Sequence, residues 1–500
     1  MSRKMPIFYS ALMLTGVNLL LRLVSTSFQV YLSGRIGAAG IGLLQLVMSV
    51  GSLAMTAGMA GIRTATMYLT AEELGRKRPG NVIWVLSGCF LYSILCSGGV
   101  AIALHVFAPF LAQNWIGDIR TVDAIRLFAS FVPVCCLCGV MTGYFTAANR
   151  IGTLAAVEVA EQLLSMVVTM SVLTLWAGSD PAKACQSVIL GSGLSACMTL
   201  TALIVLRLRE NVKAARSIPV RSRLLQAAVP LALADDLKAG ISTTENLMVP
   251  KRLALYPGTA DPLAAFGTVC GMVFPVLMFP AAILFGLAEL LIPELARCAA
   301  AESRERIRYL VKRSLRVALL YGCTFCGLEY LLSKELCMAL YGSYVAGKYL
   351  RLYALLIPML YCDTITDAMT KGLGQQKACV RYNIFTSSMD VALLYLLLPH
   401  YGMMGYYFSF VITHLINFLL SLRRLLKIVG NVISPRVPIF ACLGTAGAVF
   451  IASHVHIPPL RAAAFTVVLG CLLFLLRVVG KEDIAWLKGL ICKKQTEQLP

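Results

Sequence analysis

The sequence predicts an all-α integral membrane protein with about 14 transmembrane helices. Hydrophobic residues make up 58% of its 500 residues and charged residues only 14%, whereas soluble domains have about 45–50% and about 25%. Apolar runs long enough to cross about 30 Å of hydrocarbon recur along the whole chain. A soluble fold would have to bury many helices that are apolar on every side, so this class is excluded.

The individual spans follow from these runs and from the turn residues between them. The predicted spans are 6–33, 41–69, 82–108, 122–147, 153–177, 185–207, 224–249, 263–292, 314–334, 346–370, 381–399, 403–422, 437–454 and 460–478. An even number of spans places both ends of the chain on the same side of the membrane.

Basic residues are concentrated in the turns on the side of the two termini. They cluster at Arg76–Arg78, Arg207–Arg223, Arg297–Arg313 and Arg423–Lys427. Roughly 31 Lys and Arg lie on this side and about 10 on the other, which predicts cytoplasmic termini and a plasma-membrane protein. The net charge of +20 then indicates topology and contact with membrane lipids, and no nucleic-acid partner is expected. Without a long loop for a catalytic domain, the protein is not expected to be an enzyme.

The chain shows signs of an internal duplication. An offset of 216 residues aligns Arg22 with Lys238 and Gln29 with Glu245, each pair on corresponding predicted spans. Two related halves are common in transporters. We therefore predict a six-helix lobe over 1–209, a basic cytoplasmic linker over 210–223, a second six-helix lobe over 224–430, two additional transmembrane helices over 431–480 and a cytoplasmic tail over 481–500.

The first span carries a polar stripe. Asn18, Arg22, Ser25 and Gln29 are spaced by four, three and four residues, so they share one helical face. A guanidinium stays charged at any working pH, and at the centre of a bilayer it costs about 2.5–3.5 kcal/mol on insertion scales. The stripe therefore predicts that this helix turns Arg22 towards a protein interior or a wet cavity.

The seventh span has a similar stripe. Asp235, Lys238, Ser242 and Glu245 share one face, and Asp236 and Asn246 lie beside it. One interpretation is a self-neutralising cluster in which Asp235 pairs with Lys238. The other is a cavity wall in which Lys238 and Arg22 face each other across the two halves.

Further polar groups at membrane depth have two interpretations each. Arg63 either lines the cavity or extends to the cytoplasmic face. Asp363 and Asp367 are four residues apart in the tenth span, on one helical face. Together with Asp235 and Asp236 they are candidates for ion coupling or for lining a cavity. Other single polar groups are expected to be satisfied by neighbouring helices: Asp390, His414 and Asn417. Glu158 and Glu161 are expected to reach the interface.

Glycine and proline are dense in the second and eighth spans, at corresponding places in the two halves. They are Gly51, Gly58, Gly61, Gly271, Pro275, Pro280 and Gly286. They predict either helix bending or close packing of small residues. Most of the 17 cysteines lie inside apolar runs, where they act as small hydrophobic residues. No metal site or cofactor is predicted, apart from a coupling ion whose identity stays open.

Several segments resemble the MOP exporter superfamily, which includes the MATE transporters. They are Ala11–Arg22, Gly143–Arg150 with Glu161-Gln162, Val249–Leu253 and Ile292–Leu295. The similarity is greatest to the branch of stage V sporulation protein B and the polysaccharide and lipid II flippases. The resemblance implies two six-helix lobes around a central cavity, two trailing helices and alternating access. It also implies a basic cavity residue at Arg22, whereas Phe28 replaces the second arginine expected in that span.

The leading functional hypothesis is a flippase for a lipid-linked oligosaccharide or peptidoglycan precursor, acting as a monomer in cell-wall synthesis or sporulation. The resemblance implies undecaprenyl pyrophosphate as the carrier. Its head group needs cationic partners, for which Arg22, Arg63 and Lys238 are candidates. Asn18, Gln29 and Glu245 complete the expected substrate-binding set. The alternative is a cation-coupled multidrug exporter of the MATE type, which would favour the carboxylates Asp235, Asp236, Glu245 and Asp363. A third possibility, a membrane-embedded glycosyl transferase, would need a long outer loop with acid–base residues, and the sequence has no such loop between its predicted spans.

Overall fold

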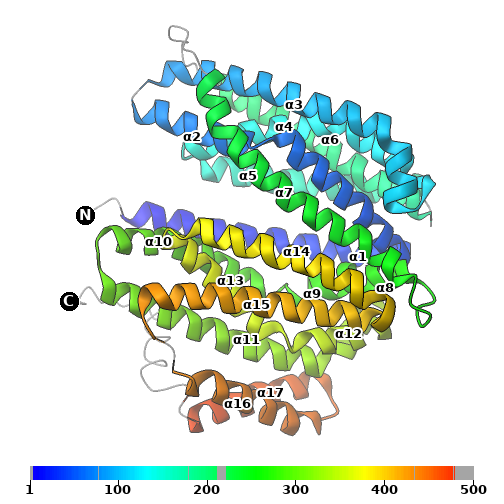
Figure 1. Ribbon diagram of the computed structural model, residues 1–500, viewed down its shortest axis with the longest axis vertical. Coiled ribbons are helices and arrows are strands. Elements are labelled where there is room, and N and C mark those ends of the chain that lie inside the picture. Colours follow the sequence, from blue (N-terminus) through cyan, green and yellow to red (C-terminus); the bar gives the residue numbers. More distant parts are fainter. Residues whose placement is uncertain are drawn as a thin grey trace. The chain divides into compact units, whose positions relative to one another are not determined.

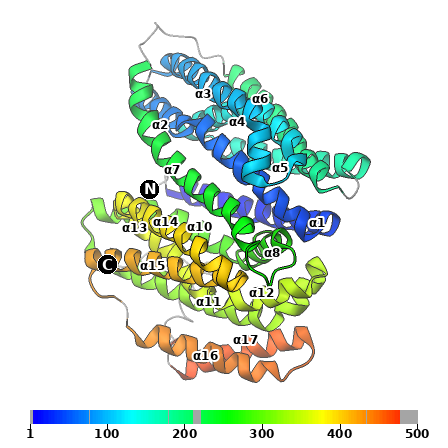
Figure 2. The same cartoon turned by 45° about the vertical axis from the view of Figure 1, so that its right-hand side comes forward.

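The computed structural model describes residues 4–76, 78–177, 180–210, 221–432, 434–476 and 478. Within these ranges the chain forms α-helices joined by short 3-10 and π-helical turns, and no strand is present there (Figures 1 and 2). Nine helices of the described part are long and apolar enough to cross a membrane, or ten with one bent pair. The predicted all-α, multi-pass membrane fold is confirmed. The number fourteen stays a prediction, although every predicted span has helical residues at its place.

The helices belong to two compact units, each of which is described by itself. Unit 1 consists of residues 1–282 and 384–413, and unit 2 of residues 283–383 and 414–500. The predicted division into two six-helix lobes is a different partition and remains a prediction.

Unit 1 contains the following main elements: α1 Lys4–Met59, α2 Ile62–Gly75, α3 Val82–Phe110, α4 Val122–Ala147, α5 Ile151–Val172, α6 Pro181–Leu208, α7 Arg221–Leu253, α8 Pro262–Thr268, η5 Val269–Val273, α9 Phe274–Leu277, most of α14 Gln376–Tyr401 and the start of α15 Met403–Val429. Its short turns are η1 Pro79–Asn81, η2 Leu111–Ile116, η3 Ile119–Thr121 and η4 Leu173–Ala177. The helices α3, α4 and α6 lie side by side, and α2 packs on α3 and α4 (Figure 1). A core of fully buried residues, including Ile62, Val85, Val140 and Phe145, holds α2, α3 and α4 together.

Unit 2 contains α10 Ala281–Ala300, α11 Arg304–Tyr341, α12 Tyr344–Ala354, α13 Ile357–Gly372, the remainder of α15, α16 Arg436–Ser453 and α17 Pro458–Leu475. The helices α16 and α17 pack side by side and against α11 (Figure 2). Cys323 of α11, Ala441 and Ala448 of α16, and Phe465 and Leu469 of α17 form the buried contact among these three helices.

The glycine and proline residues of the second and eighth spans show both predicted features: the two spans bend, and Cβ atoms built on Gly51 and Gly271 would lie 2.8 Å from Phe128 and 1.9 Å from Ile41. In the second span, α1 ends at Met59 and α2 begins at Ile62, with Ala60 and Gly61 between them at φ values of 42° and 71°. The eighth span contains the π-helical turn η5 and then bends by 64° between α9 and α10. The tenth span is also broken, because Pro358 lies in the first turn of α13 and cannot continue the hydrogen bonds of α12.

Candidate functional site

The polar stripe on α1 is turned partly away from the surface of unit 1. Arg22 and Gln29 are half-buried, whereas the neighbouring Leu20 and Leu23 are 50% and 53% exposed. The Gln29 Nε2 atom donates a hydrogen bond to the Gly271 carbonyl oxygen of η5 at 3.2 Å. Leu21 and Val24 are half-buried as well, and Ser25 of the same stripe is exposed, so the Arg22 side chain is only partly shielded. The side chain of Asn18 lies outside the described residues.

A close helix contact joins the first and second halves of the sequence within unit 1, and we call it the glycine seam: Ala38 and Gly42 of α1 with Leu263 and Gly267 of α8. A Cβ atom built on Gly267 would lie 2.0 Å from the Ala38 carbonyl oxygen, and one on Gly42 would lie 2.4 Å from the Leu263 carbonyl oxygen. Real side chains never come that close, so glycine is what allows this backbone approach. On the predicted topology the seam lies at the outer ends of the second and eighth spans.

Two further hydrogen bonds join α1 to α7. The Thr243 hydroxyl donates to the Ser49 carbonyl oxygen at 3.1 Å, and the Asn246 Nδ2 atom donates to the Ser49 hydroxyl at 3.1 Å. The Lys251 ammonium, near the end of α7, donates to the Asn114 carbonyl oxygen of η2. These hydrogen bonds connect α7, which begins the second half of the chain, to α1 and η2 of the first half.

Glu245 belongs to a cluster that also contains Asp390, Ser409 and Thr413. The Ser409 hydroxyl donates to the Asp390 carboxylate at 2.5 Å, and the Thr413 hydroxyl does so at 3.3 Å. Asp390 is 8% exposed, and its carboxyl group interacts with that of Glu245. Glu245 itself is half-buried, and two carboxylates this close repel each other when both are charged. The prediction that neighbouring helices satisfy Asp390 is confirmed, but its position beside Glu245 was missed.

The other charged residues of the α7 stripe are more accessible. Asp235 and Lys238 are exposed, and Asp236 is half-buried. Asp236 interacts electrostatically with Tyr92 of α3, whose hydroxyl donates to the Ala60 carbonyl oxygen at the break between α1 and α2. No salt bridge joins Asp235 to Lys238, both of which the structure describes, so the self-neutralising interpretation of this stripe gains no support.

Arg63 lies at the start of α2, directly after the break in the second span. Its side chain is exposed and interacts electrostatically with Glu158 of α5, which is half-buried. Glu161, one turn further along α5, is hydrogen-bonded to Thr199 of α6. These two carboxyl groups therefore have partners on other helices, which the expectation of an interfacial position did not include.

In unit 2, the two predicted carboxylates of α13 both have partners. The Asn417 Nδ2 atom of α15 donates to the two Asp363 carboxylate oxygens at 3.3 and 3.2 Å. Asp367 forms a 2.6 Å salt bridge with Lys371, one turn along the same helix. The expectation that a neighbouring helix satisfies Asn417 holds for its amide nitrogen, whereas its Oδ1 atom is buried without a hydrogen-bond partner.

A polar network at the basic side of unit 1 was not predicted. Glu73 of α2 is 1% exposed and accepts hydrogen bonds from Arg223 of α7 at 2.9 Å and from Asn81 at 2.9 Å. Arg223 also pairs with Glu72 at 2.6 Å. This network connects the end of α2 to the start of α7. In the described part of the chain, no group of three or more His, Cys, Asp or Glu side chains could hold a metal ion.

Comparisons with known proteins agree with this fold. No protein-family model matches the chain. It is 22% identical over 430 residues to stage V sporulation protein B of Bacillus subtilis (strain 168), covering 80% of each protein. Its fold matches that of the lipid II flippase MurJ in an inward closed conformation with a TM-score of 0.70 and 12% identity, covering 93% of this chain and 99% of that one.

A second solved structure is an inward-facing multidrug resistance MATE family transporter of the MOP superfamily. It matches with a TM-score of 0.65 and 15% identity, covering 83% of this chain and 100% of that one. The resemblance of the sequence to the MOP exporter superfamily is confirmed, and this chain has the fold of the MATE and MurJ transporters of that superfamily.

Proposed function

We propose that the protein is a flippase that moves a lipid-linked oligosaccharide or peptidoglycan precursor across the cytoplasmic membrane by alternating access. The observation that carries this proposal is the half-buried arginine of α1, in a chain with the fold of a lipid II flippase. The carrier would be undecaprenyl pyrophosphate. Its hydrocarbon tail would stay in the lipid, while its charged head group would cross the membrane through the interior of the protein.

The basic residues would hold the pyrophosphate. Arg22, Arg63 and Lys238 would supply positive charge, and guanidinium groups bind phosphate oxygens in a bidentate manner. Asn18, Gln29 and Glu245 would bind the saccharide through hydrogen bonds. In the present conformation Gln29 donates to the Gly271 carbonyl oxygen, so its substrate contact would require α1 to separate from η5. The protein would act as a monomer with both termini in the cytoplasm.

The test is transport by the purified protein in vesicles. A fluorescent undecaprenyl-pyrophosphate-linked saccharide is placed in both leaflets, and a membrane-impermeant quencher reports how fast the inner pool becomes accessible. The protein should raise the rate well above that of protein-free vesicles. A rate equal to that of protein-free vesicles would refute the flippase assignment.

A second candidate is a cation-coupled exporter of the MATE type, favoured by the close pair of Glu245 and Asp390. Such a pair could release a proton or cation in one conformation and bind a cationic substrate in another. Replacing Asp235 with Asn and Glu245 with Gln should then reduce drug efflux more than it reduces glycan flipping. If flipping falls and drug efflux is unaffected, the roles of these carboxylates are the reverse of those expected here.

A further inference from the structure

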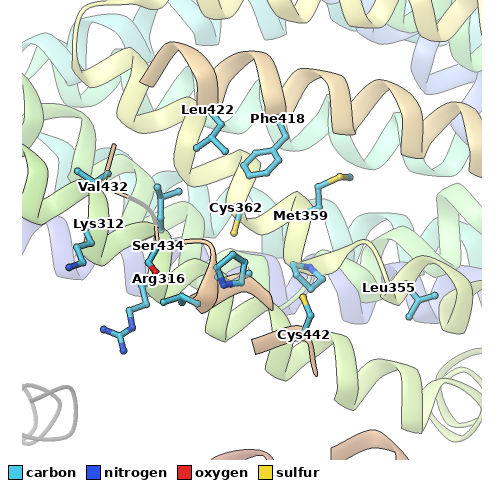
Figure 3. A pocket seen from close by; sticks show the side chains of 15 residues that line it. Lys312, Arg316, Leu355, Met359, Cys362, Phe418, Leu422, Val432, Ser434 and Cys442 are labelled. Atoms are coloured by element: carbon cyan, nitrogen blue, oxygen red, sulfur yellow. The ribbon is translucent and has the colours of Figure 1, made fainter. Parts of the chain in front are cut away.

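A cavity of about 440 Å³ lies inside unit 2, where α11, α13, α15 and α16 meet. Its walls are mostly apolar, with Met359, Phe418 and Leu422 among the lining residues. Figure 3 shows that the basic side chains of Lys312 and Arg316 lie together at one end and that Leu355 lies at the other. The cavity is therefore apolar in its body and positively charged at one end.

A polar cavity of about 420 Å³ adjoins this basic end. It shares Lys312, Val432 and Ser434 with the apolar cavity and adds Arg308, Tyr309 and Asn431. No carboxylate side chain is among the described residues that line either space. Together the two cavities form an amphipathic site, which we call the α11–α16 pocket.

With a third cavity beside it, the pocket extends along α11 over a length close to the thickness of the bilayer hydrocarbon. This third cavity, of about 580 Å³, shares Leu355, Pro358 and Cys442 with the apolar one and continues to Tyr330. The helix rises about 27 Å from Lys312 to Tyr330, close to the roughly 30 Å of bilayer hydrocarbon. On the predicted topology, Arg308 and Lys312 lie at the cytoplasmic surface, and the apolar cavities lie beside the lipid chains.

We propose that the α11–α16 pocket binds one anionic glycerophospholipid of the cytoplasmic leaflet. Its phosphate would lie between Arg308 and Lys312, and one acyl chain would lie against Met359, Phe418 and Leu422. Charge-assisted hydrogen bonds to phosphate and burial of an acyl chain both favour this occupant, and the cytoplasmic leaflet is rich in anionic lipid. The Arg316 guanidinium donates to the Val478 carbonyl oxygen, so Arg308 and Lys312 are the head-group residues.

A small phosphodiester head group suits this site better than the head group of a lipid-linked glycan. The polar cavity of about 420 Å³ brings Arg308 and Lys312 together, and two cations with no carboxylate among the described residues that line it suit a single phosphodiester. A bound acyl chain would contact both α16 and the helices α11, α13 and α15, and would thus stabilise the attachment of the α16–α17 pair. The proposal is independent of which substrate the protein transports.

The experiment measures retained lipid and thermal stability of the purified full-length protein. Mass spectrometry counts phospholipid per protein, and unfolding is followed after addition of phosphatidylglycerol or phosphatidylcholine. Phosphatidylglycerol should co-purify and raise the melting temperature more than phosphatidylcholine does. The double variant Arg308→Gln/Lys312→Gln should bind it at least about tenfold more weakly, because two charge-assisted bonds are lost.

Two further variants separate this site from general effects. Arg304→Gln/Arg423→Gln removes two exposed basic residues that line none of these cavities and should behave like the wild type. Val437→Phe fills the apolar cavity while keeping both basic residues and should lose the bound lipid without losing the fold. Equal effects of the two lipids, unchanged retention in Arg308→Gln/Lys312→Gln, or a polyprenyl phosphate as the retained species would overturn the proposal.

Discussion

Two buried carboxylates of the described residues have partners on other helices, whereas the Glu329 Oε2 atom of α11 is buried without a hydrogen-bond partner. Asp390 of α14 is held by Ser409 and Thr413 of α15, and Glu73 of α2 is held by Arg223 of α7. Removing one member of such a pair leaves a buried charge without compensation, which costs more than the pair itself contributes. Each pair therefore fixes how two helices lie against each other.

The link between α2 and α7 gives a prediction for Arg223→Ala. The Glu73 carboxylate is almost completely buried and would keep only the bond from Asn81, so we expect a loss of about 3 kcal/mol of stability. The control is Arg76→Ala, which removes a pair between the exposed Arg76 and Glu72 and should cost at most about 1 kcal/mol. Chemical denaturation of the two purified variants measures this difference. Equal losses would show that burial of Glu73 is unimportant.

A pH-dependent contribution is expected at Asp118, in the turn between η2 and η3. Hydrogen bonds from the Arg120 guanidinium hold the pKa of Asp118 below its usual value, burial acts in the opposite direction, and the Arg120 backbone N–H adds to the lowering. The stability from this pair is present above the unfolded-state pKa of about 4 and is lost as the pH falls through the lower folded-state pKa. It is small, up to about 1 kcal/mol, because Arg120 is mostly exposed.

The variant Asp118→Asn keeps the side-chain oxygen that accepts from the Arg120 backbone but removes the charge. Its melting temperature should lie below that of the wild type at neutral pH, and the gap should close in acid. A gap that does not change with pH would show that the ion pair adds nothing to the turn.

The predicted site was recovered only in part from the sequence. Spacing along one helix placed Arg22 and Gln29 on a shared face and identified Glu245 as unusual. It could not show that Asp390 contacts Glu245 or that Glu158 lies near Arg63, because these partners are far apart in the chain and meet only through helix packing. A helical period carries no signal for such pairs.

At the scale of elements, two helix breaks lie in the second and the eighth predicted spans, which correspond to each other in the two halves of the sequence. The second span is interrupted at Ala60 and Gly61, and the eighth contains η5 and a 64° bend. At the outer ends of these two spans, on the predicted topology, the glycine seam brings the backbones of α1 and α8 into direct contact. A helix pair that can approach closely and also bend is suited to opening and closing during alternating access.

The seam predicts opposite outcomes for two Gly→Ala variants. Gly267→Ala places a methyl group against the Ala38 carbonyl oxygen, so α1 must move away from α8 at a cost of about 1–3 kcal/mol. Gly34→Ala, in the part of α1 before its non-helical residue Gly37, meets open space and should be neutral or stabilising by up to about 1 kcal/mol. Thermal unfolding distinguishes them. If the two variants were equally stable, α1 and α8 would not pack as closely at Gly267 as described.

The positions of the helices were well predicted, whereas their interruptions were less so. Long apolar runs fixed α3, α4, α6 and α16 to within a few residues. The predicted tenth span is two helices, α12 and α13, and the π-helical turns η2, η4 and η5 were not foreseen. Hydropathy reports only that a segment prefers lipid, whereas a local change of helix type depends on contacts with neighbouring helices.

At the scale of the whole molecule, the proposed flippase function depends on one charged side chain, that of Arg22. The fold is that of the MATE and MurJ transporters, which by itself does not identify a substrate. The proposed substrate class depends on a half-buried guanidinium on α1, Arg22, which we propose binds a pyrophosphate. The carboxylates Asp235, Asp236, Asp363 and Asp367 would then act in the conformational cycle rather than bind the pyrophosphate.

The most direct test measures flipping of a fluorescent lipid-linked saccharide by Arg22→Ala, Arg22→Lys and Arg35→Ala in vesicles. Arg35 is an exposed arginine further along α1, so its removal controls for a lost charge on this helix. We expect Arg22→Ala to flip the lipid no faster than protein-free vesicles do, Arg22→Lys to be partly active and Arg35→Ala to be nearly as active as the wild type. All three proteins should be folded. Wild-type flipping by Arg22→Ala would contradict the proposed role of Arg22.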